Sequence, residues 1–304
     1  MKSQLNAYML FCEHFNFSPF PVSKQSFLAY LAFLSKSLSC YRSVVNYINI
    51  LKHINRSLGE DLSFMHDYDA FLTLRALRRV MGDSVRITHP VTVDMLLNIF
   101  HIFDWSNPLH VCMHAAFLVA FFSFLRISNL VPHKASDMAP VNTYFLKRED
   151  VSFSAHGAVL RIFKTKTLQF RQRVLQIPLP VIPNSILCPV AALKAYLSLV
   201  PAPLSAPLFM VPVANSAKPL LAAHFNRFLK ACASATGFDP NHFSSRSFRQ
   251  GGATFVFNCG APTEFIKAQG DWQSDAYLIY LKLSTQKKLD ILRAISSRLS
   301  HIRL

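Results

Sequence analysis

The stretch "FSSRSFRQGGATF", residues 243–255, places two arginines three positions apart and follows them with two glycines. Residues with this spacing lie on the same face of a helix, so Arg246 and Arg249 would point in one direction. Two permanent positive charges side by side, in a chain that is 51% hydrophobic, indicate that this face holds an anion. We expect Gly251 and Gly252 to let the helix backbone approach that anion closely.

The charge of the whole chain points to a polyanionic partner. The 304 residues include 32 Lys and Arg against 16 Asp and Glu, and the isoelectric point is about 9.8. Residues 1–88 carry 10 basic and 6 acidic side chains, and the rest carry 22 and 10, so most of the excess lies in the second part. Nucleic acid is the first candidate and an anionic membrane surface the second.

Several classes of protein are excluded by what the sequence lacks. The apolar run at 115–125 is too short to span a bilayer and predicts a buried helix, so we do not expect a membrane protein. The "HVCMH" stretch, residues 110–114, has no partner motif for a zinc site, and no phosphate-binding P-loop is present. Acidic residues are too sparse in the second part for a two-metal nuclease. We expect neither a metal nor a cofactor.

The cysteines are scattered, with no C-x-x-C pair, which is typical of free thiols in a reducing compartment. They are Cys12, Cys40, Cys112, Cys188, Cys232 and Cys259.

The first 81 residues predict four helices. One begins at a capping serine, Ser23, and another covers "SVVNYINILKHI", residues 43–54. The stretch 68–82 is expected to bury Phe71, Leu74 and Leu77 and to end at Gly82. Its outward arginines form either a solvated helix face or a set of phosphate contacts, and the overall charge favours phosphate. These arginines are Arg75, Arg78 and Arg79.

The second part follows a linker at 85–91 and a helix start at Thr92. Two helices are expected up to residue 125. Residues 151–180 alternate in polarity and carry Gly157 at a turn position, which predicts antiparallel strands. After residue 200 we expect helices only. The fold class is therefore mainly α with a small antiparallel β-sheet, divided into domains at 1–84 and 92–304.

Several residues of the second part have side chains that could take part in catalysis. They are Arg126, Lys166, the pair Arg246 and Arg249, and Tyr280. Taken singly, each has a structural explanation: a helix cap, a solvated edge strand or a packed tyrosine.

Together these residues resemble the pattern of the tyrosine recombinases, the phage-integrase family. The stretches "FLRISNLVP", "KTKTLQF", "RSFRQGGATF" and "QGDWQSDAYLIYL" are most similar to the eukaryotic branch carried by DIRS-type and Crypton-type mobile elements. The resemblance covers nearly the whole chain. It implies a helical core-binding (SAM-like) domain at 1–84 and a catalytic domain at 92–304.

The resemblance also implies roles for these residues. Arg126 and Arg249 would clamp the scissile phosphate, and Tyr280 would attack it to form a covalent intermediate. Lys166 would be the general acid, with Lys164 as the alternative because "KTK" leaves the register open. Guanidinium groups suit this work because they are planar, permanently charged and bidentate toward phosphate oxygens.

Two positions depart from the family pattern. The family's usual histidine is Arg246 here, and an arginine can bind phosphate but cannot take up the tyrosine proton as a base. His242 is a conceivable substitute. Asp271 stands where His or Trp is usual, and we expect it to orient Arg249 or Arg246, with Trp272 supplying an indole donor and packing.

The resulting hypothesis is a site-specific DNA recombinase or integrase that acts through a 3′-phosphotyrosyl intermediate. A domesticated DNA-binding protein that does not cut is the alternative, and a 3′-linked tyrosine topoisomerase is a third possibility. The expected partner is double-stranded DNA, not a small molecule or a membrane, and the resemblance implies action in the nucleus. Expected DNA contacts outside the catalytic set are Arg75, Arg78, Arg79, Lys164, Arg171 and Trp272.

The tail, residues 284–304, predicts a helix with an apolar side formed by Leu289, Leu292, Ile295 and Leu299. That side packs either on its own domain or on a neighbouring subunit. The resemblance implies a homotetramer on DNA and a monomer when free.

Overall fold

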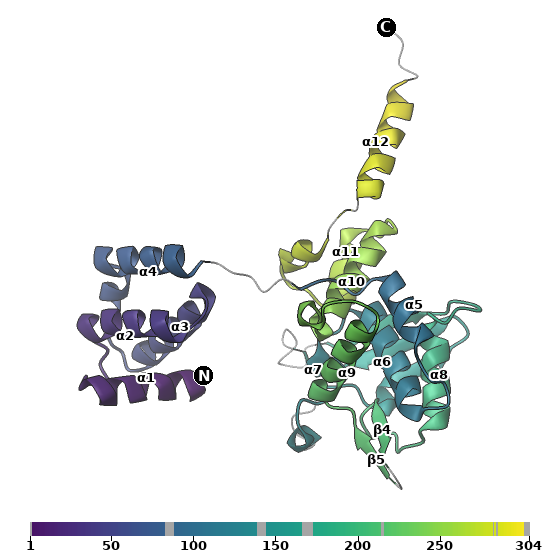
Figure 1. Ribbon diagram of the computed structural model, residues 1–304, viewed down its shortest axis with the longest axis horizontal. Helices are drawn as coiled ribbons and strands as arrows, with labels where there is room; N and C mark the ends of the chain where they lie inside the picture. The colour runs from purple at the N-terminus through teal and green to yellow at the C-terminus, as the bar shows by residue number, and fades with distance from the viewer. Residues whose placement is uncertain are drawn as a thin grey trace. The chain divides into compact units, whose positions relative to one another are not determined.

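The chain forms two compact units, Met1–Arg86 and Ile87–Leu304 (Figure 1). The structure is a computed structural model that describes residues 2–82, 88–138, 144–165, 173–213, 216–281, 283 and 285–300. Part of the expected linker, 85–87, lies outside these residues. His89 and Val91, also in that stretch, belong to the second unit, where their amide groups donate to the carbonyl oxygens of His242 and Ser247.

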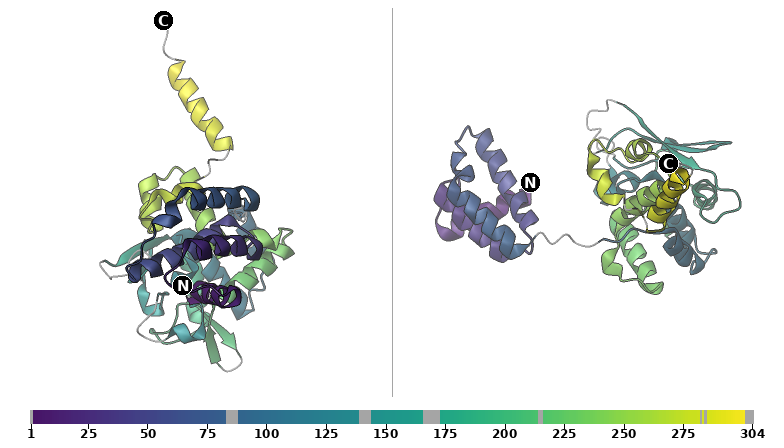
Figure 2. Two further views of the ribbon diagram at one scale, coloured as in Figure 1. Left: turned by 90° about the vertical axis from the view of Figure 1, so that its left-hand side faces the viewer. Right: turned by 90° about the horizontal axis from the view of Figure 1, so that it is seen from above.

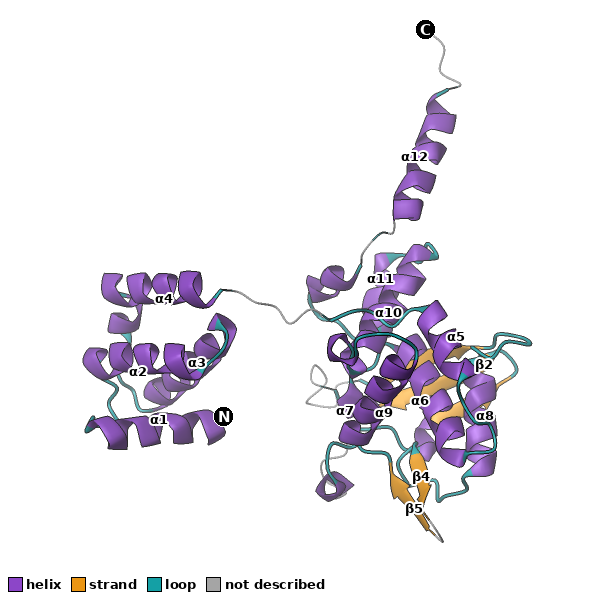
Figure 3. Ribbon diagram, in the orientation of Figure 1, coloured by secondary structure: helices purple, strands orange, loops and turns teal. Residues whose placement is uncertain are grey.

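The first unit is a helical bundle around one apolar core, as the sequence predicted (Figure 3). Ser23 caps the second helix, because its side chain accepts a hydrogen bond from the amide of Ser26 at 3.1 Å. The elements are α1 (Lys2–Phe15), α2 (Lys24–Ser37), α3 (Tyr41–Ser57), the 3₁₀-helix η1 (Ser63–His66) and α4 (Tyr68–Met81).

One core assignment in α4 is wrong. Ala70 is the buried residue of this helix, and Leu74 and Leu77 pack partly against the core. Phe71 is 53% exposed because it lies one position beyond the face that these three residues share. The guanidinium of Arg75 lies 6.0 Å from its ring centroid, so this aromatic side chain stands on the same surface as the arginines.

The second unit is built around α6 (Pro108–Ser123), most of whose residues are buried, as the apolar run predicted. Helix α6 contacts α8 (Pro189–Leu199), α10 (Ser245–Asn258) and the sheet (Figure 3). The other helices of eight residues or more are α5 (Val93–His101), α9 (Ala222–Ala235) and α12 (Thr285–Leu299). Shorter ones are α7 (Ile127–Leu130), η2 (Ala135–Met138), η4 (Arg148–Asp150), η5 (Pro240–His242), α11 (Thr263–Gln269) and η6 (Asp275–Tyr280).

The predicted antiparallel sheet is present. Its strands are β1 (Val151–Ser154), β2 (Gly157–Ile162) and β3 (Leu175–Pro180), in that spatial order. The expectation of helices alone after residue 200 is wrong, because β4 (Met210–Val213) and β5 (Ser216–Pro219) form a second antiparallel pair. Strands of four residues are too short for their alternation to stand out, and two of these eight residues are prolines.

The tail helix α12 is exposed along its apolar side, and the side chains of Leu289, Leu292 and Ile295 are 42%, 59% and 48% exposed. All six cysteines are free thiols. Within the described residues, no helix has both the length and the apolar character that crossing a bilayer requires.

Candidate active site

The start of α10 fixes the direction of both arginines of the opening motif. Ser244 is the N-cap residue of this helix, and its amide donates a hydrogen bond to the side-chain oxygen of Ser247 at 3.1 Å. Phe248 is fully buried, with its ring centroid 4.8 Å from that of Phe117 on α6. The packing of Phe248 therefore anchors the first turns of α10 on the core of the unit.

Arg249 is the most enclosed arginine of the site, at 5% exposed. Its Nη2 donates to the carbonyl oxygen of Gly270 at 2.8 Å, and its Nη1 donates to the carbonyl oxygen of Phe124. The carbonyl of Phe124 is turned by a left-handed backbone, φ 51°, directly after α6. The guanidinium also lies 3.7 Å from the ring centroid of Trp272. Arg249 thus joins the ends of three segments that are far apart in sequence.

The electrostatics of Arg249 show that further arginines lie nearby. Burial is the main cause that lowers the pKa of its guanidinium from the ordinary value to about 9, and the positive charge of Arg126 is the next. Arg246 lowers it further, whereas Tyr280 and Asp271 raise it. The group remains charged at neutral pH. Three arginines in mutual repulsion form a site in which a bound anion would be stabilised.

Tyr280 lies at this cluster, at the end of the 3₁₀-helix η6. Its ring packs in a small apolar cluster with Phe124 and Trp272. Its hydroxyl oxygen accepts a hydrogen bond from Nε of Arg246 at 2.9 Å. Because Thr254 on α10 also donates to the carbonyl oxygen of Tyr280, the tyrosine is fixed to the arginine helix at two points.

The two glycines of α10 have a different role from the expected one. A Cβ on Gly251 would lie 1.8 Å from the carbonyl oxygen of Val91, and a Cβ on Gly252 would lie 1.9 Å from that of Phe121. The space beside both glycines is therefore filled by the protein itself. Gly251 and Gly252 allow α10 to pack against the start of α5 and the end of α6, which brings Arg249 to the carbonyl of Phe124.

Asp271 is buried between Gly270 and Trp272, at 3% exposed, with a left-handed φ of 51° that aspartate tolerates. We expected it to orient Arg249 or Arg246. Its carboxylate accepts hydrogen bonds from the hydroxyl of Thr165, at 2.7 Å, and from Nη2 of Arg173, at 3.0 Å. Its charge acts on Arg249 over a distance, because it raises the pKa of that guanidinium.

Trp272 is 8% exposed and stacks under Arg249, so it belongs to the packing of the site. Gly270 leaves room for this ring, since a Cβ at position 270 would lie 1.7 Å from a ring carbon of Trp272. Sequence reasoning had proposed an indole donor and packing for Trp272, and the packing is evident.

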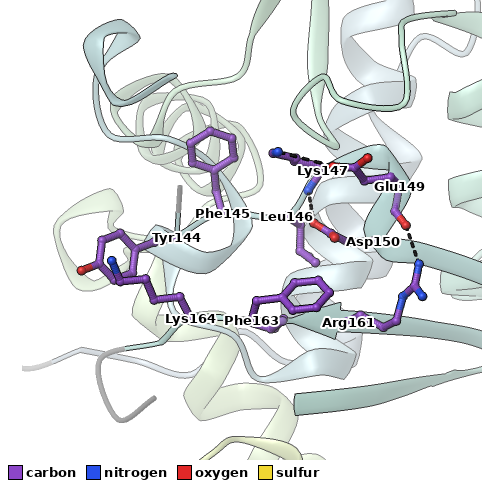
Figure 4. A pocket seen from close by; sticks show the side chains of 10 residues that line it. Tyr144, Phe145, Leu146, Lys147, Glu149, Asp150, Arg161, Phe163 and Lys164 are labelled. Carbon is purple, nitrogen blue, oxygen red and sulfur yellow. Dashed lines mark hydrogen bonds and ion pairs between the residues drawn. The ribbon is translucent and has the colours of Figure 1, made fainter. Parts of the chain in front are cut away.

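A groove of about 260 Å³ runs beside strand β2, and Lys164 is part of its lining (Figure 4). The ammonium of Lys164 lies 4.3 Å from the ring centroid of Tyr144, and the two side chains lie against each other in the close-up. The residues of the arginine cluster and Tyr280 do not line this groove. Lys166 and Arg171, the other predicted cations of the hairpin, lie outside the described residues.

His242 and the "HVCMH" histidines have partners of their own. Nε2 of His242 lies 3.2 Å from a carboxylate oxygen of Asp239, and its ring centroid is 4.6 Å from that of His89. Nδ1 of His110 accepts from the amide of Asp104 at 2.9 Å, and His114 binds the carbonyl oxygen of Ile186 at 2.7 Å. Among the described residues, no group of three or more His, Cys, Asp or Glu could hold a metal ion.

The structure thus brings Arg126, Arg246, Arg249, Asp271 and Tyr280 together, although they span about half of the chain. The arginines of α4 belong to the other unit and are exposed on one helix face. Sequence reasoning missed Asn129, Thr165 and Arg173, which hold the hairpin in place. Asn129 stands in the "FLRISNLVP" stretch, but its spacing alone carries no signal of a contact to residue 164.

No protein-family model and no curated protein sequence matches the chain. Solved structures do match. The Tn1549 transposon integrase, in complex with transposon right-end DNA, superposes with a TM-score of 0.59 at 15% identity, over 98% of this chain and 93% of that one. The XerH site-specific recombinase, in a post-cleavage complex with its palindromic difH substrate, gives 0.56 at 12% identity, over 91% and 73%. A lambda integrase dimer bound to a COC′ core site gives 0.55 at 14% identity, over 93% and 89%.

The chain has the tyrosine-recombinase fold. The match extends over both units, since nearly all of the chain is covered. The mainly α architecture with a small antiparallel sheet, which the sequence predicted, is thereby confirmed.

Proposed function

We propose that the protein is a site-specific DNA recombinase that cuts and rejoins strands through a covalent bond between Tyr280 and DNA. The observation that carries this proposal is the hydrogen bond of 2.9 Å between Arg246 and the hydroxyl of Tyr280, inside a cluster that includes Arg126 and Arg249. A nucleophilic hydroxyl beside several guanidinium groups is the arrangement that attack on a phosphodiester requires.

In the proposed cleavage step, Tyr280 Oη forms a bond to the scissile phosphorus and the bond from phosphorus to the 5′ oxygen breaks. The 5′ oxygen takes a proton and leaves as a hydroxyl, while the proton of Tyr280 passes to solvent or a base. The product is a 3′-phosphotyrosine ester, whose bond energy allows a different 5′-hydroxyl to attack and rejoin the strand. Arg126, Arg246 and Arg249 would stabilise the extra negative charge of the pentavalent transition state.

The proton for the leaving oxygen is proposed to come from Lys166. The alternative, Lys164, has its ammonium over the ring of Tyr144. Comparing Lys166→Met with Lys164→Met in the cleavage assay assigns the donor, because removal of a general acid costs about 100- to 10,000-fold in rate. A small effect of Lys166→Met together with a large effect of Lys164→Met reverses the assignment.

Double-stranded DNA is the proposed substrate, in line with the DNA complexes of the structural neighbours. Arg75, Arg78, Arg79 and Arg171 are proposed to contact its backbone. The likeness of the motifs to DIRS-type and Crypton-type elements supports a mobile-element origin and action in the nucleus.

The decisive experiment uses suicide DNA duplexes that carry a nick next to the scissile phosphate, so that religation is prevented. Pools of such duplexes with varied sequence would be incubated with the protein, and covalent adducts would be separated by denaturing electrophoresis. We expect an adduct with the wild-type chain and none with Tyr280→Phe, which keeps the ring packing but removes the nucleophile. An adduct that persists in Tyr280→Phe would move the nucleophile to another residue, with Tyr277 as the first to test.

A second candidate function is DNA binding without cleavage. The observation in its favour is that Arg246, which cannot accept a proton near neutral pH, occupies the hydrogen-bonding position at the Tyr280 hydroxyl. Tight DNA binding with no adduct on any duplex of the pool would establish this function in place of the first. Relaxation of supercoiled DNA without any need for paired sites would indicate a topoisomerase instead.

The assembly proposed for DNA is a homotetramer, with a monomer in the absence of DNA. A lambda integrase tetramer bound to a Holliday junction is among the structures that share the fold, with a TM-score of 0.55 at 13% identity. The exposed apolar side of α12 supplies a surface for contact between subunits. Light scattering of the protein with and without a synthetic four-way junction measures the mass directly, and a tetramer without DNA would contradict the proposal.

A further inference from the structure

The carboxylate of Asp271 holds both described ends of the segment that joins β2 to β3. The hydroxyl of Thr165 donates to Oδ2 at 2.7 Å, and Nη2 of Arg173 donates to Oδ1 at 3.0 Å. Each carboxylate oxygen therefore has its own donor, one from either side of the hairpin. Thr165 is 1% exposed, so its contact lies in the interior, whereas the side chain of Arg173 is 55% exposed.

The carboxylate is itself held firmly in relation to Arg249. The carbonyl oxygen of the preceding residue, Gly270, accepts a hydrogen bond from Arg249. The ring of the following residue, Trp272, lies under the same guanidinium. Gln269 extends this anchor, because its side-chain amide donates to the carbonyl oxygens of Phe122 at 3.0 Å and of Pro178 at 3.1 Å. Residues 269–272 thus connect α6, β3, α10 and the hairpin.

The strand end that carries Thr165 has a second anchor, on the side of Arg126. Asn129, 2% exposed, donates from its side-chain amide to the carbonyl oxygen of Lys164 at 3.0 Å and to that of Tyr144 at 2.9 Å. Asn129 lies in α7, which begins directly after Arg126. The start of the hairpin is therefore tied both to the segment that carries Arg126 and to the turn that holds Arg249.

We propose that Thr165 and Arg173 are positioning residues that act through Asp271 to fix the hairpin relative to the arginines and Tyr280. This inference rests on the proposed cleavage reaction, in which the hairpin supplies the proton for the leaving 5′ oxygen. A donor displaced by about 1 Å loses much of its effect.

The proposal can be separated from a general role in folding by changing the leaving atom. A 5′ oxygen must be protonated as it leaves, since an alkoxide is far too basic to leave unprotonated at neutral pH. A sulfur in the same bridging position leaves as a thiolate, because thiols have pKa values of about 8.5, and it needs no proton donor. A residue that only positions the donor matters for the oxygen substrate and not for the sulfur substrate.

The experiment compares Thr165→Val and Arg173→Met on nicked suicide duplexes with oxygen or sulfur as the bridging atom, at saturating DNA. Both substitutions keep the approximate volume of the side chain and remove the donor to Asp271. We expect cleavage of the oxygen substrate to fall by about 10- to 100-fold, a part of what general acid catalysis contributes. Cleavage of the sulfur substrate should stay at the wild-type rate, and Arg173→Lys should recover part of the lost rate.

Matched controls come from the same unit. The hydroxyl of Thr236 donates to carbonyl oxygens at the end of its own helix, and Arg161, on β2, donates to the carbonyl oxygen of Glu149. Thr236→Val and Arg161→Met should cleave both substrates at the wild-type rate. Arg249→Lys, which alters the phosphate clamp, should slow both substrates equally.

Equal losses on the two substrates for Thr165→Val and Arg173→Met would overturn the positioning role and place these residues with the phosphate clamp or the fold. Wild-type rates on both substrates would overturn it as well. If the wild-type chain forms no adduct with either bridging atom, the proposed recombinase function fails first, and the inference falls with it.

Discussion

Arg249 and the arginines of α4 are the same residue type in opposite environments. Arg249 is 5% exposed, bonded to carbonyl oxygens and stacked on Trp272. Arg75, Arg78 and Arg79 are exposed on one helix face of the first unit. Both sets suit a phosphate partner, but the buried guanidinium is fixed in one geometry and the exposed ones can adapt to many.

The difference in burial between these arginines implies different contributions to catalysis and to DNA binding. Removing a cation from water destabilises it, and this is why burial lowers the pKa of Arg249 to about 9. A charge held in a dry, rigid site acts strongly on the transition state, because no reorganisation is needed when the phosphate reacts. Exposed arginines act on binding, through counterion release, and carry little information about the chemistry.

The largest effect is expected for Arg249→Met. Loss of this cation should reduce cleavage by about 1,000-fold. The thermal midpoint should fall modestly, because relief of the buried charge offsets only part of the loss of two charge-assisted hydrogen bonds, each worth about 1.5–3 kcal/mol. Single-turnover cleavage and calorimetry measure the two quantities. Arg161→Met, at an exposed arginine of β2, is the control and should alter neither. A Met variant at 249 that unfolds would make this arginine a structural residue.

Arg249→Lys should move the pH dependence of DNA binding. The wild-type guanidinium loses its proton only as the pH rises through about 9, so DNA affinity should be maintained up to that pH. A lysine starts from a lower pKa, about 10.4, and the same burial would lower it further. The variant should therefore lose affinity at a lower pH than the wild-type chain does. Fluorescence anisotropy across pH 6 to 10 tests this, and coincident profiles would contradict it.

A smaller effect is expected for Arg246→His, which restores the residue that the family pattern usually has. A neutral imidazole at this position can accept the proton of Tyr280, and its ordinary pKa is about 6.5. Cleavage by the variant at saturating DNA should rise about 3- to 10-fold from pH 6 to 8, a modest share of general base catalysis. The wild-type rate should be flat over the same range. A flat profile for the variant would show that position 246 takes no part in removing the proton.

Much of this organisation could be predicted from the sequence, for physical reasons. Helices such as α2, α3 and α6 have strong apolar periodicity or continuous apolar character, and their caps are local features. The residues of the candidate site were found because, taken together and in this order along the chain, they resemble the pattern of a known family, although each alone has a structural explanation.

The contacts that the sequence did not predict are long-range. Thr165 and Asp271 are 106 positions apart, and no local pattern marks a hydrogen bond between them. Gly251 was assigned to the anion because glycine near arginine suggests a close approach, but the group that approaches is the carbonyl of Val91. Phe71 was misplaced because a helix face is about 100° wide, and a residue at its margin can fall on either side.

The smallest effect is expected on the exposed side of the comparison. Arg79→Gln removes one charge from α4 and leaves the helix intact, since both residues favour helices. If Arg79 contacts one phosphate, the slope of log affinity against log salt should become shallower by about 0.9, with a few-fold weaker binding near physiological salt. Cleavage at saturating DNA should be unchanged, because a contact to the DNA backbone acts on binding. A changed cleavage rate with an unchanged salt slope would contradict the division of labour between the two regions, since it would connect an exposed arginine of the first unit to the chemistry.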